Sequence, residues 1–358
     1  MASLFYITEK YNTKNRCIKH LEKVRWNNKP VCPHCAEKQR ITKRIARKFF
    51  YHCNNCNKDF TVLYGTIFED SKLGLPKWFV LIGLMLNSRK GISAMAISRH
   101  LNVTYKTAWY SAMRVRCCMI DNGEKLEGIV EMDEAYLGGR PRKGNTGKNP
   151  PDNEAYLGNV SVVKRGRGTK KVPIIGIVER NGKKRVVAQV GNRLNSAAML
   201  AMLKKFVKQD NAIVMTDEAR FYNKFDDIVQ HLVIKHKEKF ADGIINTNRI
   251  ENFWSIIKNG IRGEYHVLSK KYLPFYLAEF SYKYNSRFTQ QKAFEDTIKN
   301  AVTDESCLVN YKPKKSCGTP KKCCKKSKQT SKEAAAVLKD VQRIIDAARR
   351  KKIRRLVK

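Results

Sequence analysis

Two aspartates follow apolar, β-branched segments in a way that could bring carboxylates together. Gly128–Met132 leads into Asp133, and Ala212–Thr216 leads into Asp217. Such segments are typical of buried strands, so we expect two strands that end on these aspartates and place both carboxylates at one edge of a sheet. A third acid, Glu251, lies among apolar residues at helical spacing, and Lys258 follows two turns later on the same helix face.

Two strand-end aspartates and one helical glutamate offer the hard oxygen ligands that a pair of Mg²⁺ or Mn²⁺ ions requires. Such a pair, roughly 3.5–4 Å apart, supports phosphodiester chemistry. The alternative is that each acid only caps a helix or forms a turn after a strand. The neighbouring acids Glu131, Glu134 and Glu218 rank below the aspartates, because we expect strand alternation or the following turn to direct them away from the metals.

Four cysteines have the spacing of a structural zinc site. They form two C-x2-C pairs with 17 residues between the pairs: Cys32, Cys35, Cys53 and Cys56. Two tight turns of this kind present four thiolates to one tetrahedral Zn²⁺. Four unrelated buried cysteines are the alternative, and a redox pair is disfavoured because no βαβ pattern surrounds either motif.

The segment after the cysteines is predicted to be helical. Pro76–Asn87 is an apolar helix, a second helix runs over Ser93–Leu101, and Thr104 caps a third. Two short helices joined by a tight turn outline a helix-turn-helix, whose second helix would present Tyr105, Lys106 and Thr107 to a DNA major groove. An ordinary helical spacer is the alternative.

The composition indicates a nucleic-acid partner. The 358 residues contain 72 lysines and arginines against 32 acids, a formal charge of +40, which a polyanion would neutralise. The 42% hydrophobic content excludes a wholly disordered chain, and the longest apolar run is too short to cross a bilayer. An odd count of 11 cysteines and an N-terminus without a secretion pattern favour a reducing, intracellular location. That location would be the bacterial cytoplasm or nucleoid, or the nucleus of a eukaryotic or viral host.

Composition also divides the chain into four regions. We expect an N-terminal helix and zinc ribbon at 1–70, a helix-turn-helix at 71–125, a catalytic domain at 126–300 and a lysine-rich tail at 301–358. Residues 311–358 hold 18 lysines and arginines against 3 acids. We expect the first part of the tail to be disordered and the last part to form a basic amphipathic helix.

These motifs together resemble the DDE transposases of zinc-ribbon insertion sequences, the ISXO-like group, to which the eukaryotic Merlin elements look related. The matching segments are the cysteine pairs, Gly65–Glu69, Gly91–Ser93 with Lys106–Trp109, Glu131–Glu134 with Gly138 and Gly139, Thr216 and Asp217, and Asn248–Glu251 with Trp254 and Lys258. The resemblance implies an α/β, RNase H-like core in which Asp133, Asp217 and Glu251 bind two divalent metals and Lys258 contacts DNA. Asn246 departs from the family, which often has histidine there, and the tail has no counterpart.

The sequence therefore predicts a metal-dependent transposase. It would bind the terminal inverted repeats of its element, cleave the strands and join the freed 3′-hydroxyl groups to target DNA, as a homodimer or larger assembly on DNA. One rival is a domesticated, inactive DNA-binding protein, which the three intact acids disfavour. The other is an RNase H-like nuclease or resolvase, which the N-terminal DNA-reading modules disfavour.

Overall fold

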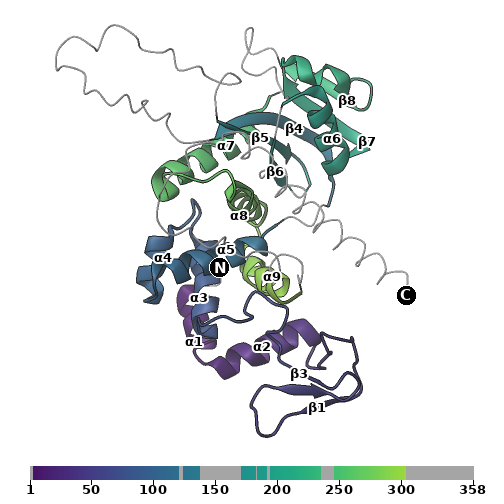
Figure 1. Ribbon diagram of the computed structural model, residues 1–358. Coiled ribbons are helices and arrows are strands. Elements are labelled where there is room, and N and C mark those ends of the chain that lie inside the picture. Colours follow the sequence, from purple (N-terminus) through teal and green to yellow (C-terminus); the bar gives the residue numbers. More distant parts are fainter. Residues whose placement is uncertain are drawn as a thin grey trace, which may run out of the picture. The chain divides into compact units, whose positions relative to one another are not determined.

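The computed structural model describes residues 3–120, 124–137, 171–182, 184–191, 194–234 and 246–303. By its contacts the chain divides into two compact units, 1–122 with 278–358 and 123–277. Figure 1 labels the elements. This division groups the last helix with the N-terminal elements. It is a division by contacts and not by function, so the expected regions 71–125 and 126–300 remain predictions. The tail beyond residue 303 and the glycines at 138 and 139 lie outside the described residues.

Helices of the first unit share one hydrophobic core. They include α1 (Leu4–Lys10), α2 (Lys14–Trp26), α3 (Leu75–Asn87) and α9 (Gln290–Thr303). The buried ring of Phe79 on α3 lies 4.6 Å from that of Tyr11 and 6.1 Å from that of Phe294 on α9. Helix α9 is therefore part of the same core as the N-terminal helices, although more than 200 residues of sequence separate Phe79 from Phe294.

A small antiparallel sheet carries the cysteine pairs. It consists of β1 (Ile41–Lys43), β2 (Tyr51–Cys53) and β3 (Lys58–Phe60). The indole of Trp26, at the end of α2, packs edge-on against the rings of Tyr51 and Phe60. This contact joins the sheet to the helical core.

Two short helices follow α3 as the sequence predicts. They are α4 (Ala94–Leu101) and α5 (Tyr105–Cys117). The hydroxyl of Ser93 caps α4 and that of Thr104 caps α5, while Asn102 turns the chain in the left-handed conformation. The predicted helix-turn-helix outline and its caps are confirmed. Helix α8 (Leu273–Asn285) contacts α5 through the buried ion pair between Glu279 and Arg116.

In the described residues of the second unit, five strands form a mixed sheet. They are β4 (Leu126–Leu137), β5 (Val172–Glu179), β6 (Val186–Val190), β7 (Val207–Asp217) and β8 (Gln230–Ile234), in the order β6-β5-β4-β7-β8. The pairs on the β6 side are antiparallel and those on the β8 side are parallel. The predicted α/β class is confirmed, and the strand order is that of an RNase H-like core.

Helices cover both faces of this sheet (Figure 1). Val130 and Met132 on β4 pack with α6 (Ser196–Phe206) and with the 3₁₀ helix Arg220–Phe225. Side chains alternate along a strand, so Glu131 and Asp133 point to the other face, where α7 (Asn248–Gly260) lies. A π-helical turn, Ile261–Tyr265, continues α7.

One predicted boundary is wrong. Strand β4 does not end at Asp133 but runs four residues further, because Asp133 to Leu137 continue to pair with Val172 to Gly176 on β5. Glu134 therefore lies within a strand and not in a turn. No helix among the described residues is long and apolar enough to span a membrane.

Candidate active site

Three carboxylates converge where β4 and β7 run side by side. Among the described residues, one oxygen each of Asp133, Glu134 and Asp217 lie within 4.8 Å of one another. Asp133 and Glu134 come from the middle of β4, and Asp217 is the last residue of the parallel neighbour β7. The fold thus brings together the two aspartates that the sequence singles out, and adds Glu134.

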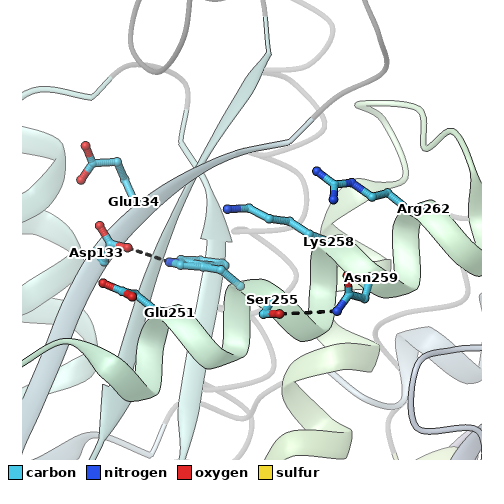
Figure 2. A pocket seen from close by; sticks show the side chains of 8 residues that line it. Asp133, Glu134, Glu251, Ser255, Lys258, Asn259 and Arg262 are labelled. Carbon is cyan, nitrogen blue, oxygen red and sulfur yellow. Dashed lines mark hydrogen bonds between the residues drawn. The ribbon is translucent and has the colours of Figure 1, made fainter.

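A pocket of about 420 Å³ opens beside these carboxylates. Asp133, Glu134 and Glu251 line one end, and Lys258 and Arg262 continue the lining along α7 and the turn after it. Figure 2 shows Asp133, Glu134 and Glu251 at one end of the pocket and the Lys258 amino group pointing toward that end. Glu251 is not one of the three acids within 4.8 Å; its Oε1 accepts a hydrogen bond from the Thr247 hydroxyl at 3.2 Å.

The Asp133 carboxyl lies in surroundings that favour its protonated form. Burial raises its pKa to about 7, and the adjacent Glu134 charge adds to the shift. The indole Nε1–H of Trp254 opposes this by donating to Asp133 Oδ2 at 3.0 Å. A carboxylate in such surroundings gains strongly from a cation, because the cation offsets both burial and repulsion between the acids.

Glu134 was expected to turn away from the site, and this expectation is wrong. One oxygen of its carboxylate lies within 4.8 Å of oxygens of Asp133 and Asp217, and the buried Tyr222 hydroxyl donates to Glu134 Oε2 at 3.1 Å. Burial holds the pKa of Tyr222 well above its ordinary value, so the hydroxyl keeps its proton and acts as a donor. An acidic residue directly after Asp133 is the signal that the sequence offers for this position.

Glu131 was likewise expected to point away from the face that Asp133 occupies, and it does not. Residues two apart on a strand share a face, and Glu131 lies on the α7 side, where it accepts hydrogen bonds from the backbone N–H groups of Arg249 and Ile250. Its other oxygen is paired with Arg180 at 2.5 Å. Glu131 is thus a buried structural acid next to the pocket.

The four predicted cysteine ligands are brought together by the small sheet. Their sulfurs all lie within 4.8 Å of one another, with 3.6 Å between Cys32 and Cys56 and 3.5 Å between Cys35 and Cys53. Zn–S bonds of about 2.3 Å in a tetrahedron separate the sulfurs by about 3.8 Å, so the cluster fits zinc. A backbone N–H of Glu37 lowers the pKa of Cys35 to about 7, which favours the thiolate form that binds metal.

The predicted DNA-reading residues lie at the first turn of α5. Tyr105 is 51% exposed, and Lys106 is exposed beside it. The backbone N–H of Thr107 donates to the capping Thr104 hydroxyl at 3.3 Å. These residues form the start of the second helix of the helix-turn-helix and belong to the first unit, whereas the residues of the acidic pocket belong to the second.

Comparison with known proteins finds a family match for each of the two regions. Residues 125–285 match the ISXO2-like transposase domain, and residues 12–59 match the transposase zinc-ribbon domain. A protein of Halobacterium salinarum, described as an uncharacterized protein in transposable element ISH50, is 27% identical over 279 residues, which is 75% of this chain and 90% of that one.

Two solved structures were also matched, at low similarity. One is a pre-cleavage Mos1 transpososome, with 14% identity and a TM-score of 0.26 over 63% of this chain and 78% of that chain. The other is a simian T-cell lymphotropic virus intasome in complex with a PP2A regulatory subunit, with 11% identity and a TM-score of 0.26 over 56% of this chain and 67% of that chain. TM-scores this low carry no weight for the fold. The family matches do carry weight: the chain contains an ISXO2-like transposase domain at residues 125–285 and a transposase zinc-ribbon domain at residues 12–59.

Proposed function

We propose that this protein cleaves the ends of a transposable element and joins them to target DNA, with divalent metal bound by Asp133, Asp217, Glu251 and Glu134. The observation that carries the proposal is the gathering of the two aspartates and Glu134 within 4.8 Å, beside a pocket that Glu251 and Lys258 also line. The residues concerned lie within the segment that matches the transposase domain.

The carboxylates fit a hard divalent cation, because they present several oxygens in one half-buried, mutually repelling cluster. Bound Mg²⁺ or Mn²⁺ would supply activation of the attacking water or 3′-hydroxyl and stabilisation of the leaving oxygen. The protein's part is to hold the ligands in place. Trp254 fixes the Asp133 oxygen by its hydrogen bond, and Tyr222 fixes Glu134 in the same way.

Cationic side chains on α7 are suited to hold the DNA strand. Lys258 and Arg262 line the pocket next to the acids, so a phosphate approaching the carboxylates would contact their charges. Neither group takes part in proton transfer in this proposal. They position the scissile phosphate, which is why loss of Lys258 should reduce the rate less than loss of an acid.

The zinc ribbon and the helix-turn-helix would recognise the element ends. The four cysteines would hold a structural Zn²⁺, and Tyr105, Lys106 and Thr107 would enter the major groove. The hairpin between β1 and β2 adds an exposed basic surface of Lys43, Arg44, Arg47 and Lys48. Of these, Arg44 is paired with Asp59, and the other three are suited to phosphate contacts.

Two further parts of the proposal concern assembly and location. Cleavage and joining of two element ends would require at least two copies of the chain on DNA. The protein would act inside the cell, wherever the host DNA lies, and a host with a nucleus would require import.

The test uses a labelled duplex carrying the inverted repeat that flanks the coding sequence, with Mg²⁺ or Mn²⁺, and a gel-shift on the same duplex. Wild type should nick the duplex, and Asp133→Ala and Asp217→Ala should bind it without nicking. Asp227→Ala, at an exposed acid that does not line the pocket, should cleave like wild type. Cleavage by the Asp133 or Asp217 variant would overturn the metal site, and DNA binding without cleavage by wild type would favour an inactive binder.

A further inference from the structure

The start of α7 lacks the usual side-chain cap. Its N-cap residue, Thr247, makes no capping hydrogen bond to the helix. The Thr247 hydroxyl instead donates to Oε1 of Glu251 at 3.2 Å. The second and third backbone N–H groups of a helix have no partner within the helix, and an N-cap side chain normally accepts from one of them. In α7 these groups belong to Arg249 and Ile250.

A side chain from the sheet accepts both. Glu131 Oε2 lies 2.9 Å from the backbone N of Arg249 and 2.9 Å from that of Ile250. Glu131 is fully buried, at 0% exposure, so its charge is stabilised by its partners and not by water. Its carboxylate also faces the positive end of the helix dipole. An acid on β4 thus takes the place of the helix's own cap.

Arg180 completes the attachment. It follows β5, its Nε donates to Glu131 Oε1 at 2.5 Å, and its guanidinium also donates to the backbone and side-chain oxygens of Asn246, just before α7. In addition, the Arg249 guanidinium donates a hydrogen bond to the backbone carbonyl of Arg180 at 2.9 Å. The entry into α7 is therefore bonded to both β4 and β5.

The attachment joins two parts of the candidate site. Glu131 lies two residues before Asp133 on one strand face, and Glu251 directly follows the Ile250 N–H that Glu131 accepts. We propose that Glu131 is a positioning residue that caps α7 from the sheet and so sets Glu251 opposite Asp133. The inference rests on the proposed function of the pocket, and adds that a residue which binds neither metal nor DNA controls the ligand geometry.

The test measures Mn²⁺ binding to the full-length protein in the absence of DNA. Electron paramagnetic resonance detects the bound Mn²⁺. Glu131→Gln keeps the side-chain size but removes the charge and one acceptor, and it should weaken Mn²⁺ binding about tenfold or more, as loss of a residue supporting metal ligands does. Hydrogen exchange of the peptide spanning 246–254 should increase at the same time.

Glu279→Gln is the matched control. Glu279 is equally buried and paired with Arg116 and Lys283, but in the first unit. It should lose stability and keep Mn²⁺ affinity within about twofold of wild type. Equal losses of Mn²⁺ affinity in both variants would overturn the inference, because they would reflect general destabilisation.

Arg180→Lys decides the matter if Glu131→Gln does not fold. It keeps a positive charge beside Glu131 but loses the fork that reaches Asn246, so Mn²⁺ affinity should fall by a smaller factor. Wild-type Mn²⁺ affinity in a folded variant of either residue would overturn the positioning role while leaving the metal site intact. Absence of Mn²⁺ binding to wild type would instead overturn the proposed function, and the inference with it.

Discussion

The substitution Gly176→Ala adds one methyl group, which should disturb the candidate site through the side chains of α7. Gly176 on β5 pairs with Asp133 on β4 and lies under α7. A Cβ at this position would lie 2.6 Å from Cζ2 and Cη2 of Trp254 and 2.8 Å from Cδ1 of Ile250. Both side chains are buried, at 3% and 0% exposure, so neither can move into solvent.

The magnitude follows from these distances. Carbon atoms pack at about 3.5–4.0 Å, so Gly176→Ala requires the Trp254 ring to move by about 1 Å. Overpacking of this kind costs about 1–3 kcal/mol. The same movement stretches the 3.0 Å bond from Trp254 to Asp133, and a hydrogen bond to a charged group contributes about 1.5–3 kcal/mol. Overpacking together with a weakened hydrogen bond should lower the free energy of unfolding by about 2–4 kcal/mol.

The assay is urea unfolding combined with hydrogen exchange of the peptides that cover β5 and α7. Gly263→Ala is the matched control. Gly263 belongs to the same unit as Gly176, and a Cβ at position 263 would meet nothing within 4 Å. It should leave stability unchanged or raise it by about 0.4–1 kcal/mol. A Gly176→Ala protein within about 0.5 kcal/mol of wild type, with unchanged exchange in α7, would refute the tight contact between β5 and α7.

Three further predictions concern pH and metal. Burial alone would raise the pKa of Glu279, but Lys283 and Arg116 lower it to about 2, below the ordinary 4.5. This acid therefore stabilises the fold above pH 4.5 and loses its contribution as pH falls toward 2, and Glu279→Gln should flatten that part of an acid-unfolding curve followed by circular dichroism. Since the pKa of Asp133 is raised to about 7, protons compete with metal there, and Mn²⁺ affinity should rise with pH up to about 7 and then level off; a pH-independent affinity in wild type would contradict this. Elemental analysis should find one zinc per chain. Removal of the zinc by a chelator should increase hydrogen exchange in residues 32–60 without affecting α7. A purified protein that contains no zinc but still protects residues 32–60 from exchange would exclude the zinc site.

Local patterns in the sequence predict most of the elements. The caps Ser93 and Thr104, the apolar helix after Pro76 and the strand leading into Asp217 lie where the sequence places them. These features depend on neighbours within a few residues, which the sequence displays directly. The cysteine pairs are a similar case, because their spacing alone specifies two turns.

The positions of Glu134 and Glu131 in the site depend on contacts between segments that are distant in the sequence. Ladder hydrogen bonds to β5 carry β4 past Asp133, so Glu134 is a strand residue, and its place in the acidic cluster depends on the position of Asp217 on another strand. The role of Glu131 required knowing that the start of α7 lies over β4, 118 residues away along the chain. The sequence shows an acid in a strand, but it does not show which helix lies above it.

The most direct test of the central claim, that Asp217 binds the metal that drives strand cleavage, is a metal-specificity switch. Asp217→Cys replaces a hard oxygen ligand by a soft sulfur, which binds Mg²⁺ poorly and Mn²⁺ better. The Asp217→Cys protein should fail to nick the element-end duplex with Mg²⁺ and regain nicking with Mn²⁺. The control is Asp226→Cys, because the wild-type Asp226 carboxylate pairs with His231. This control should behave like wild type with both ions. An Asp217→Cys protein as active as wild type with Mg²⁺, or a wild type that cleaves without divalent ions, would contradict the claim.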